Sequence, residues 1–135
     1  MDKSTFKEKI LSKVWVGGFL GFFGFTKLFI PEIESYFMFM FFIFFAWYWN
    51  IKIDGEIVDE RLLENKLKAS SYGFGVSFLV IYIIIILLNS YTINFFPFLE
   101  SIEARYDFLT AIVVLSLALG VNLTSYLTYK YEVQD

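Results

Sequence analysis

The 135-residue chain contains neither cysteine nor histidine. Without cysteine it has no disulfide bond, no thiolate nucleophile and no Cys-based metal site. Without histidine it lacks the side chain that most often moves protons near neutral pH and most often binds metals. Charged residues are scarce, at 19% of the chain, and no Asp, Glu or Arg lies in the middle of an apolar stretch. Intramembrane ionisable residues often mark ion or proton pathways, so their absence argues against a proton-coupled transporter.

The chain is rich in apolar and aromatic residues instead. Hydrophobic residues make up 58% and aromatic residues 22%, including 18 Phe. A soluble domain normally exposes apolar patches of at most roughly 300–600 Å², and one of this size could not hide so much apolar surface. A bilayer removes this problem because it acts as an apolar solvent. We therefore expect one all-α integral membrane domain that covers residues 1–135.

Four apolar stretches predict four transmembrane helices. They cover residues 14–30, 36–51, 72–88 and 108–127. At about 1.5 Å per residue, the first three are only about 25 Å long, whereas the apolar core of a bilayer is about 30 Å thick. We expect the helices to extend past these limits and to pack as a four-helix bundle.

An alternative for the first two stretches is a re-entrant hairpin. Only residues 32–35 separate them, so both arms would return to the same side without crossing. This arrangement places Pro31, Glu32 and Glu34 at membrane depth, where a non-helical turn has to be shielded by protein.

The basic residues are distributed unequally between the two sides of the expected domain. Nine lie before the first stretch, between the second and third, or after the fourth, whereas the other side has only Lys27 and Arg105. The positive-inside rule therefore predicts a multi-pass membrane protein with both termini and the middle loop in the cytoplasm. The nine are Lys3, Lys7, Lys9, Lys13, Lys52, Arg61, Lys66, Lys68 and Lys130.

The first helix carries a repeated glycine. Residues 17–25 repeat a Gly-Phe-Leu/Phe unit every three residues, in which Gly17 and Gly21 form a GxxxG pair and Gly24 lies on a nearby face. Small residues let two helix backbones approach closely. This face either contacts a partner helix or a second copy, or packs against the other helices of the same chain.

The fourth helix carries a stripe of small and polar residues. Ser116, Gly120 and Thr124 follow each other at spacings of four, with Asn122 nearby. We predict a second packing face here. Asn122 is the most polar residue within an apolar stretch, and its amide is able to form a hydrogen bond across helices.

Lys27 is the one basic residue inside an apolar stretch, near its outer end. Its long side chain either extends to the interface or pairs with an acid of the outer loops. The candidate partners are Glu32, Glu100, Glu103 and Asp107.

Residues 54–71 form the cytoplasmic loop and are predicted to be helical from Asp59 onward. Acidic residues come first and basic residues last, as the helix dipole favours. The segment is either an extension of the third helix, whose lysines meet anionic headgroups, or a docking helix for a cytosolic partner. No third ligand accompanies Asp59 and Glu60, so we expect no metal and no cofactor. The docking candidates are Asp59, Glu60, Arg61, Lys66 and Lys68.

Residues 89–107 form a long outer loop. Aromatic residues come first, and acidic residues then outnumber Arg105. Long loops are often functional. Such a surface is suited to a cationic peptide, although the topology alone also depletes basic residues there.

Two segments together resemble a family of small multi-span bacterial membrane proteins, mostly from Gram-positive bacteria. They are the LGF-type repeat of residues 19–25 and the sequence Asp59-Glu60-Arg61 … Lys68-Ala69-Ser70. The resemblance covers the first three apolar stretches. It implies a helical inner-membrane fold and no particular activity.

Our leading hypothesis is a non-enzymatic accessory, regulatory or immunity-type protein. It would act in the bilayer through helix and loop contacts with another membrane protein or with itself. The alternative is a small oligomeric channel or transporter in which Ser116, Asn122 and Thr124 line the path. The chain shows no cluster of catalytic groups and no basic stripe away from the membrane that would bind nucleic acid.

Overall fold

The computed structural model describes residues 3–53, 59–88 and 96–134, and every regular element within them is a helix. Residues 54–58 of the expected cytoplasmic loop and 89–95 of the expected outer loop lie outside the described residues. In chain order, with 3₁₀ helices written η, the elements are α1 (Lys3–Leu11), η1 (Val14–Phe25), α2 (Thr26–Phe29), η2 (Tyr36–Phe45), α3 (Ala46–Ile53), α4 (Glu60–Leu87), η4 (Pro97–Leu99) and α5 (Ile102–Gln134).

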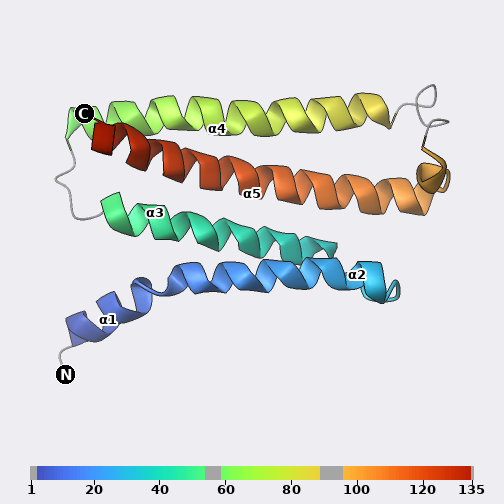
Figure 1. Cartoon of the computed structure of the whole chain (residues 1–135), viewed down its shortest axis with the longest axis horizontal. Helices are drawn as coiled ribbons and strands as arrows, with labels where there is room; N and C mark the ends of the chain where they lie inside the picture. Colours follow the sequence, from blue (N-terminus) through green and yellow to red (C-terminus); the bar gives the residue numbers. More distant parts are fainter. Residues whose placement is uncertain (1–2, 54–58, 89–95, 135) are drawn as a thin grey trace.

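Four helical arms lie side by side in a row: the first and second arms are antiparallel, as are α5 and α4, whereas the second arm and α5 run in the same direction (Figure 1). The first arm is η1 with α2, and the second is η2 with α3. The first arm packs on the second, the second on α5, and α5 on α4. Within the described chain, the first arm has no comparable contact with α4 or α5. The arrangement is therefore an open row, whereas a closed four-helix bundle would give every helix two neighbours.

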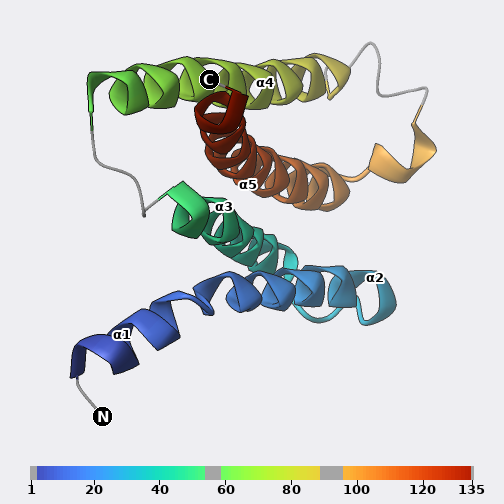
Figure 2. The same ribbon diagram turned by 60° about the vertical axis from the view of Figure 1, so that its left-hand side comes forward.

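Figure 2 shows the row from a second direction, in which α1 turns away from the other helices. Both termini lie at one end of the row, which we call the terminal end. The opposite end, where α2, η4 and the start of α5 lie, we call the acidic end (Figure 1). Its charged residues are Lys27, Glu32, Glu34, Glu100, Glu103, Arg105 and Asp107.

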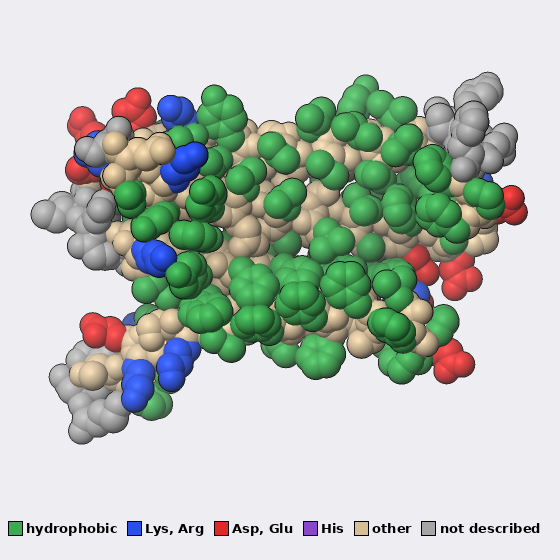
Figure 3. Space-filling model, viewed as in Figure 1, with side chains coloured by type: hydrophobic (Ala, Val, Ile, Leu, Met, Phe, Trp, Pro, Cys, Tyr) green, Lys and Arg blue, Asp and Glu red, His purple; other side chains and the backbone are tan. Residues whose placement is uncertain are grey.

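Three helices of the described chain are long and apolar enough to cross a membrane: Tyr36–Ile53, Glu60–Leu87 and Ile102–Gln134. Charged side chains gather at the two ends of the molecule, and hydrophobic side chains cover the region between them (Figure 3). This distribution matches a bilayer with two polar interfaces. The chain therefore has the character of a helical membrane protein.

The first two arms consist mainly of 3₁₀ helix, over 12 residues in η1 and 10 in η2. A 3₁₀ helix rises about 2.0 Å per residue, against about 1.5 Å for an α-helix. Each arm, including its short α-helical part, is therefore about 30 Å long, which equals the thickness of the apolar core. The length of about 25 Å expected from α-helical geometry was too short because it assumed the wrong helix type.

The charged helix expected from residue 59 and the apolar helix expected at 72–88 form one continuous helix, α4. Asp59 is its N-cap: the Asp59 Oδ1 accepts a hydrogen bond from the Leu62 backbone N–H at 2.8 Å. This bond satisfies one of the backbone donors that a helix start leaves unpaired. The fourth helix likewise extends beyond 108–127 in both directions, as α5.

Candidate functional site

The closest approach between the first two arms joins three glycines of η1 to three phenylalanine rings of η2. Gly18, Gly21 and Gly24 are buried. A Cβ added to them would lie 2.6, 2.6 and 2.5 Å from the nearest ring atoms of Phe45, Phe42 and Phe39, respectively. Real Cβ atoms essentially never show such distances, so any larger residue at these three positions would force the rings to shift. We call these six residues the Gly–Phe seam.

Aromatic rings extend this seam along both arms. Side chains three residues apart eclipse each other in a 3₁₀ helix, and rings stack at this spacing, for example Phe19 on Phe22 at 6.2 Å and Phe39 on Phe42 at 5.9 Å between centroids. Between the arms the rings meet edge to face, as Phe22 and Phe42 do at 5.1 Å. Both geometries are favourable for aromatic pairs.

Of the predicted glycine face, Gly21 and Gly24 lie in this contact, whereas Gly17 does not. Gly17 is only half-buried, and a Cβ there would lie 3.4 Å from the Phe44 ring, which is ordinary contact. Gly18, which the GxxxG spacing passed over, occupies the tight position with Gly21 and Gly24. Gly18 can be identified from the repeat, because Gly18, Gly21 and Gly24 follow each other at spacings of three. A 3₁₀ helix places residues with this spacing on one face.

A second close contact joins α4 to α5. The Ser77 Oγ is fully buried and donates a hydrogen bond to the Ser116 backbone carbonyl at 2.5 Å. Gly73 and Gly120 are buried in the same contact, beside Thr124 and Ser77. The predicted stripe of Ser116, Gly120 and Thr124 thus packs against α4 of the same chain. The Thr124 Oγ1 is buried and has no hydrogen-bond partner among the described residues.

Asn122 connects α5 to the second arm. Its Nδ2 donates hydrogen bonds to the Phe42 carbonyl at 2.9 Å and to the Ala118 carbonyl at 2.8 Å. Phe42, whose ring packs on Gly21 of the first arm, thus also accepts a hydrogen bond from Asn122 of α5. This one residue of η2 therefore contacts both the first arm and α5.

Lys27 lies in an ion-pair cluster at the acidic end. Its side chain is only 7% exposed, and its Nζ lies 2.6 Å from the Glu34 Oε2 and 2.9 Å from the Asp107 Oδ2. The Tyr36 ring lies 5.3 Å from the same ammonium. Lys27 therefore connects the first arm to α5 and does not extend outward on its own. Glu34 was missing from the expected partners, and Glu32, Glu100 and Glu103 form no ion pair with Lys27 in the described chain.

Ser35 is a second residue of this cluster, and sequence reasoning overlooked it. Its buried Oγ accepts hydrogen bonds from the Lys27 backbone N–H at 3.1 Å and from the Thr26 Oγ1 at 2.9 Å. These bonds tie the second arm to the end of the first. They set the geometry of the short turn and place Glu34 beside Lys27.

A cavity of about 400 Å³ lies at the acidic end between the first two arms, η4 and α5. Its wall is almost entirely apolar, and Asp107 is its one charged side chain. Concave, mostly apolar sites with a few polar groups are the usual form of a ligand site. The wall consists of Phe25, Leu28, Tyr36, Phe39, Phe98, Leu99, Ala104, Asp107, Phe108, Ala111, Ile112 and Leu115.

The docking candidates of the terminal end have different surroundings. Asp59 caps α4, and the Arg61 Nη2 lies 3.6 Å from the Oε2 of the buried Glu132, which also accepts a hydrogen bond from Asn65. Lys68 lies over the Tyr131 ring at 4.8 Å. The remaining two candidates, Glu60 and Lys66, are exposed.

The fold and these contacts define a helical membrane protein in which the Gly–Phe seam and the α4–α5 contact pack within the chain. Comparison of the chain with known protein families, curated proteins and solved structures finds no match. The resemblance to small bacterial multi-span proteins stays a prediction.

Proposed function

We propose that this chain is a non-enzymatic integral membrane protein that binds a partner at its acidic end, as an accessory, regulatory or immunity-type protein. The observation that carries the proposal is the apolar cavity with Asp107 in its wall. The Gly–Phe seam and the α4–α5 contact are occupied within the chain, so they are not the partner's site.

The charges around the cavity define the chemistry of the partner. Lys27 is already paired with two carboxylates, and the Arg105 guanidinium donates to the Leu99 and Glu100 carbonyls. Glu32, Glu100 and Glu103 are exposed. An apolar hollow at an end of the molecule that carries exposed acidic residues complements a segment with both apolar and basic side chains. A cationic membrane-active peptide and a basic loop of a membrane protein both have this character.

The proposal includes the orientation in the membrane. The positive-inside rule puts the terminal end in the cytoplasm and the acidic end outside. The absence of native cysteine makes this testable, because one introduced cysteine is then the only thiol. In intact cells, a membrane-impermeant maleimide should label Glu100→Cys and should leave Lys66→Cys unlabelled until the membrane is opened.

The experiment that tests the function is extraction of the native membrane into polymer discs without detergent, followed by mass determination and protein identification. We expect a stoichiometric partner that Ala111→Trp releases, because the indole fills the cavity. Leu79→Trp is the matched control, since Leu79 is exposed on α4 outside the cavity. A protein that purifies only with itself, or a partner that survives Ala111→Trp, would contradict the proposal.

A further inference from the structure

The helix α1 stands apart from the rest of the molecule. It has no extensive contact with any other helix of the described chain, and Figures 1 and 2 both show it diverging from the row. Phe6 and Ile10 are 57% and 52% exposed, so their apolar surface is uncovered within the chain. This apolar surface is therefore open to contact with groups outside the described chain.

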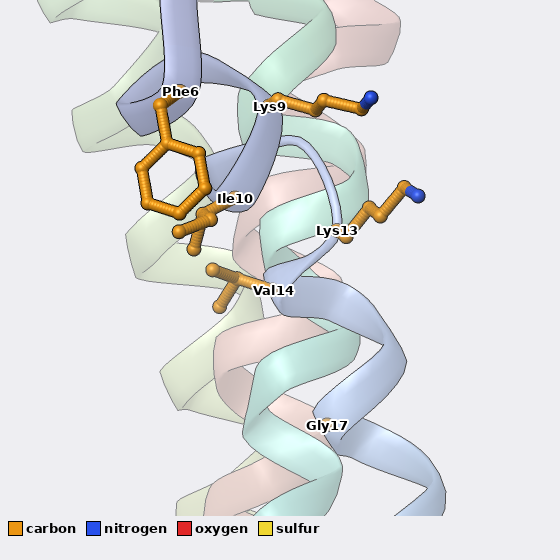
Figure 4. Close-up of a pocket in the computed structure, with 6 residues that line it drawn as sticks. All are labelled: Phe6, Lys9, Ile10, Lys13, Val14 and Gly17. Atoms are coloured by element: carbon orange, nitrogen blue, oxygen red, sulfur yellow. The ribbon is translucent and has the colours of Figure 1, made fainter. Parts of the chain in front are cut away.

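A groove of about 470 Å³ lies where α1 meets η1. Figure 4 shows that Phe6, Ile10 and Val14 extend to one side of it, whereas Lys9 and Lys13 extend to the other. Gly17 completes the lining. At the groove, apolar and basic side chains thus extend to opposite sides, so the apolar groups can enter lipid while the two ammonium groups stay at the polar interface.

The two lysines of the groove are available to a ligand. Neither Lys9 nor Lys13 forms an ion pair with any residue that the structure describes. Two further lysines, Lys3 and Lys7, lie on α1, and Glu8 is the one acidic residue of that helix. The segment is therefore locally positive, even though the whole chain has a net charge of −3.

The position of the groove along the chain favours a lipid over a soluble partner. It lies directly before the apolar residues of η1, next to Trp15, which meets the Tyr48 ring at 5.6 Å. Trp and Tyr concentrate at the headgroup level of a bilayer. The aromatic residues beside the groove therefore favour a position near the lipid phosphates, where a positive segment meets anionic headgroups.

We propose that α1 lies in the membrane surface and that its groove binds an anionic phospholipid. Phe6, Ile10 and Val14 contact the acyl chains, and the ammonium groups of Lys9 and Lys13 bind the headgroup phosphate. This site is separate from the cavity at the acidic end and does not depend on the function proposed for that cavity.

Native mass spectrometry of the delipidated full-length protein tests this proposal. The protein is titrated with phosphatidylglycerol or with phosphatidylcholine of the same acyl chains. We expect tighter binding of phosphatidylglycerol and a loss of roughly five-fold in that affinity for each of Lys9→Gln and Lys13→Gln. The Lys9→Arg/Lys13→Arg variant should retain the affinity, since the positive charge remains.

Two further variants make the test specific. Lys130→Gln removes an exposed lysine of α5 outside the groove and should leave the first phosphatidylglycerol bound with unchanged affinity. Ile10→Asn keeps both lysines but should weaken the binding of both lipids, because it removes apolar contact. Equal affinity for the two lipids, or an equal loss for Lys130→Gln and Lys9→Gln, would overturn the proposal and open the groove to a protein partner instead.

Discussion

Gly21 of η1 lies so close to the Phe42 ring of η2 that a Cβ on Gly21 would be 2.6 Å from the Phe42 Cδ1. The pairs on either side repeat this contact at intervals of three residues on both arms. An α-helix turns about 100° per residue, so residues three apart would drift around it by about 60° at each step. A 3₁₀ helix returns to the same face every three residues, which keeps all three glycines against the second arm.

This geometry predicts different costs for neighbouring glycines. Gly21→Ala should lower the free energy of unfolding by about 1–3 kcal/mol, because the added methyl overpacks the contact with Phe42. Gly17→Ala should have a much smaller effect, since its Cβ meets Phe44 at an ordinary 3.4 Å. Gly75→Ala is the control: nothing lies within 4 Å of its Cβ. Denaturant unfolding in detergent micelles, followed by tryptophan fluorescence, measures all three.

The cause of the Gly21→Ala effect is tested by reducing its neighbour. Phe42→Leu makes room for the methyl, so Gly21→Ala should cost less in the Phe42→Leu background than in the wild-type background. A cost that is the same in both backgrounds would mean that Gly21 and Phe42 do not interact. Equal losses for Gly17→Ala and Gly21→Ala would argue for an α-helical first arm.

The Lys27 cluster predicts a graded response to charge removal. Lys27→Met leaves Asp107, which is only 20% exposed, without its cation. Removing one partner of a fully buried pair costs about 3–5 kcal/mol, and we expect about 2–3 kcal/mol here because Asp107 keeps some solvent contact. Glu34→Gln should cost at most about 1 kcal/mol, because the Glu34 side chain is 74% exposed.

The double variant Lys27→Met/Asp107→Leu separates the effect of charge from that of packing. It removes both charges of this pair, so unfolding in micelles should show it to be more stable than Lys27→Met alone. If the double variant is as unstable as the sum of its single changes, the two side chains do not act as a pair.

Much of the architecture follows from composition and charge. The apolar stretches and the polar segments between them predict where the helices lie. A stretch that is long and apolar enough to cross a bilayer can be identified from the sequence alone. The helix type of the first two arms was not predicted. The period of three was visible in residues 17–25, but long 3₁₀ helices are rare, so the Gly17–Gly21 spacing suggested an α-helical face and Gly18 was missed.

The partners of single polar residues were harder to predict than the helices. Lys27 pairs with Glu34 because Ser35 sets the turn between the first two arms, and no local pattern specifies that turn. Asp107, which was among the expected partners, reaches Lys27 only because α5 packs beside the second arm. Such contacts depend on which helices are neighbours, and no single segment of the sequence specifies the order of the helices in the row.

The α4–α5 contact predicts that position 77 tolerates little change. Ser77→Val removes the hydrogen bond to the Ser116 carbonyl and adds bulk against Gly120. Overpacking and the lost bond together should cost about 2–3 kcal/mol. Ser71→Val is the matched control, since Ser71 lies exposed on the same helix and its hydroxyl bonds only to the Leu67 carbonyl. A similar loss for both variants would show a general effect of the β-branched residue on α4.

Asn122 separates the binding hypothesis from the channel alternative. Its amide already donates to the Phe42 and Ala118 carbonyls. Under the binding hypothesis, Asn122 therefore joins α5 to the second arm and does not line an ion path. Asn122→Leu should then cost about 0.6 kcal/mol and at most about 1.7 kcal/mol of stability, as other hydrogen bonds between membrane helices do. Liposomes that contain the wild-type protein should show no ion flux above that of empty liposomes. If the wild-type protein shows flux and Asn122→Leu abolishes it, the oligomeric channel is favoured. That result would mean that the Asn122 amide lines the ion path.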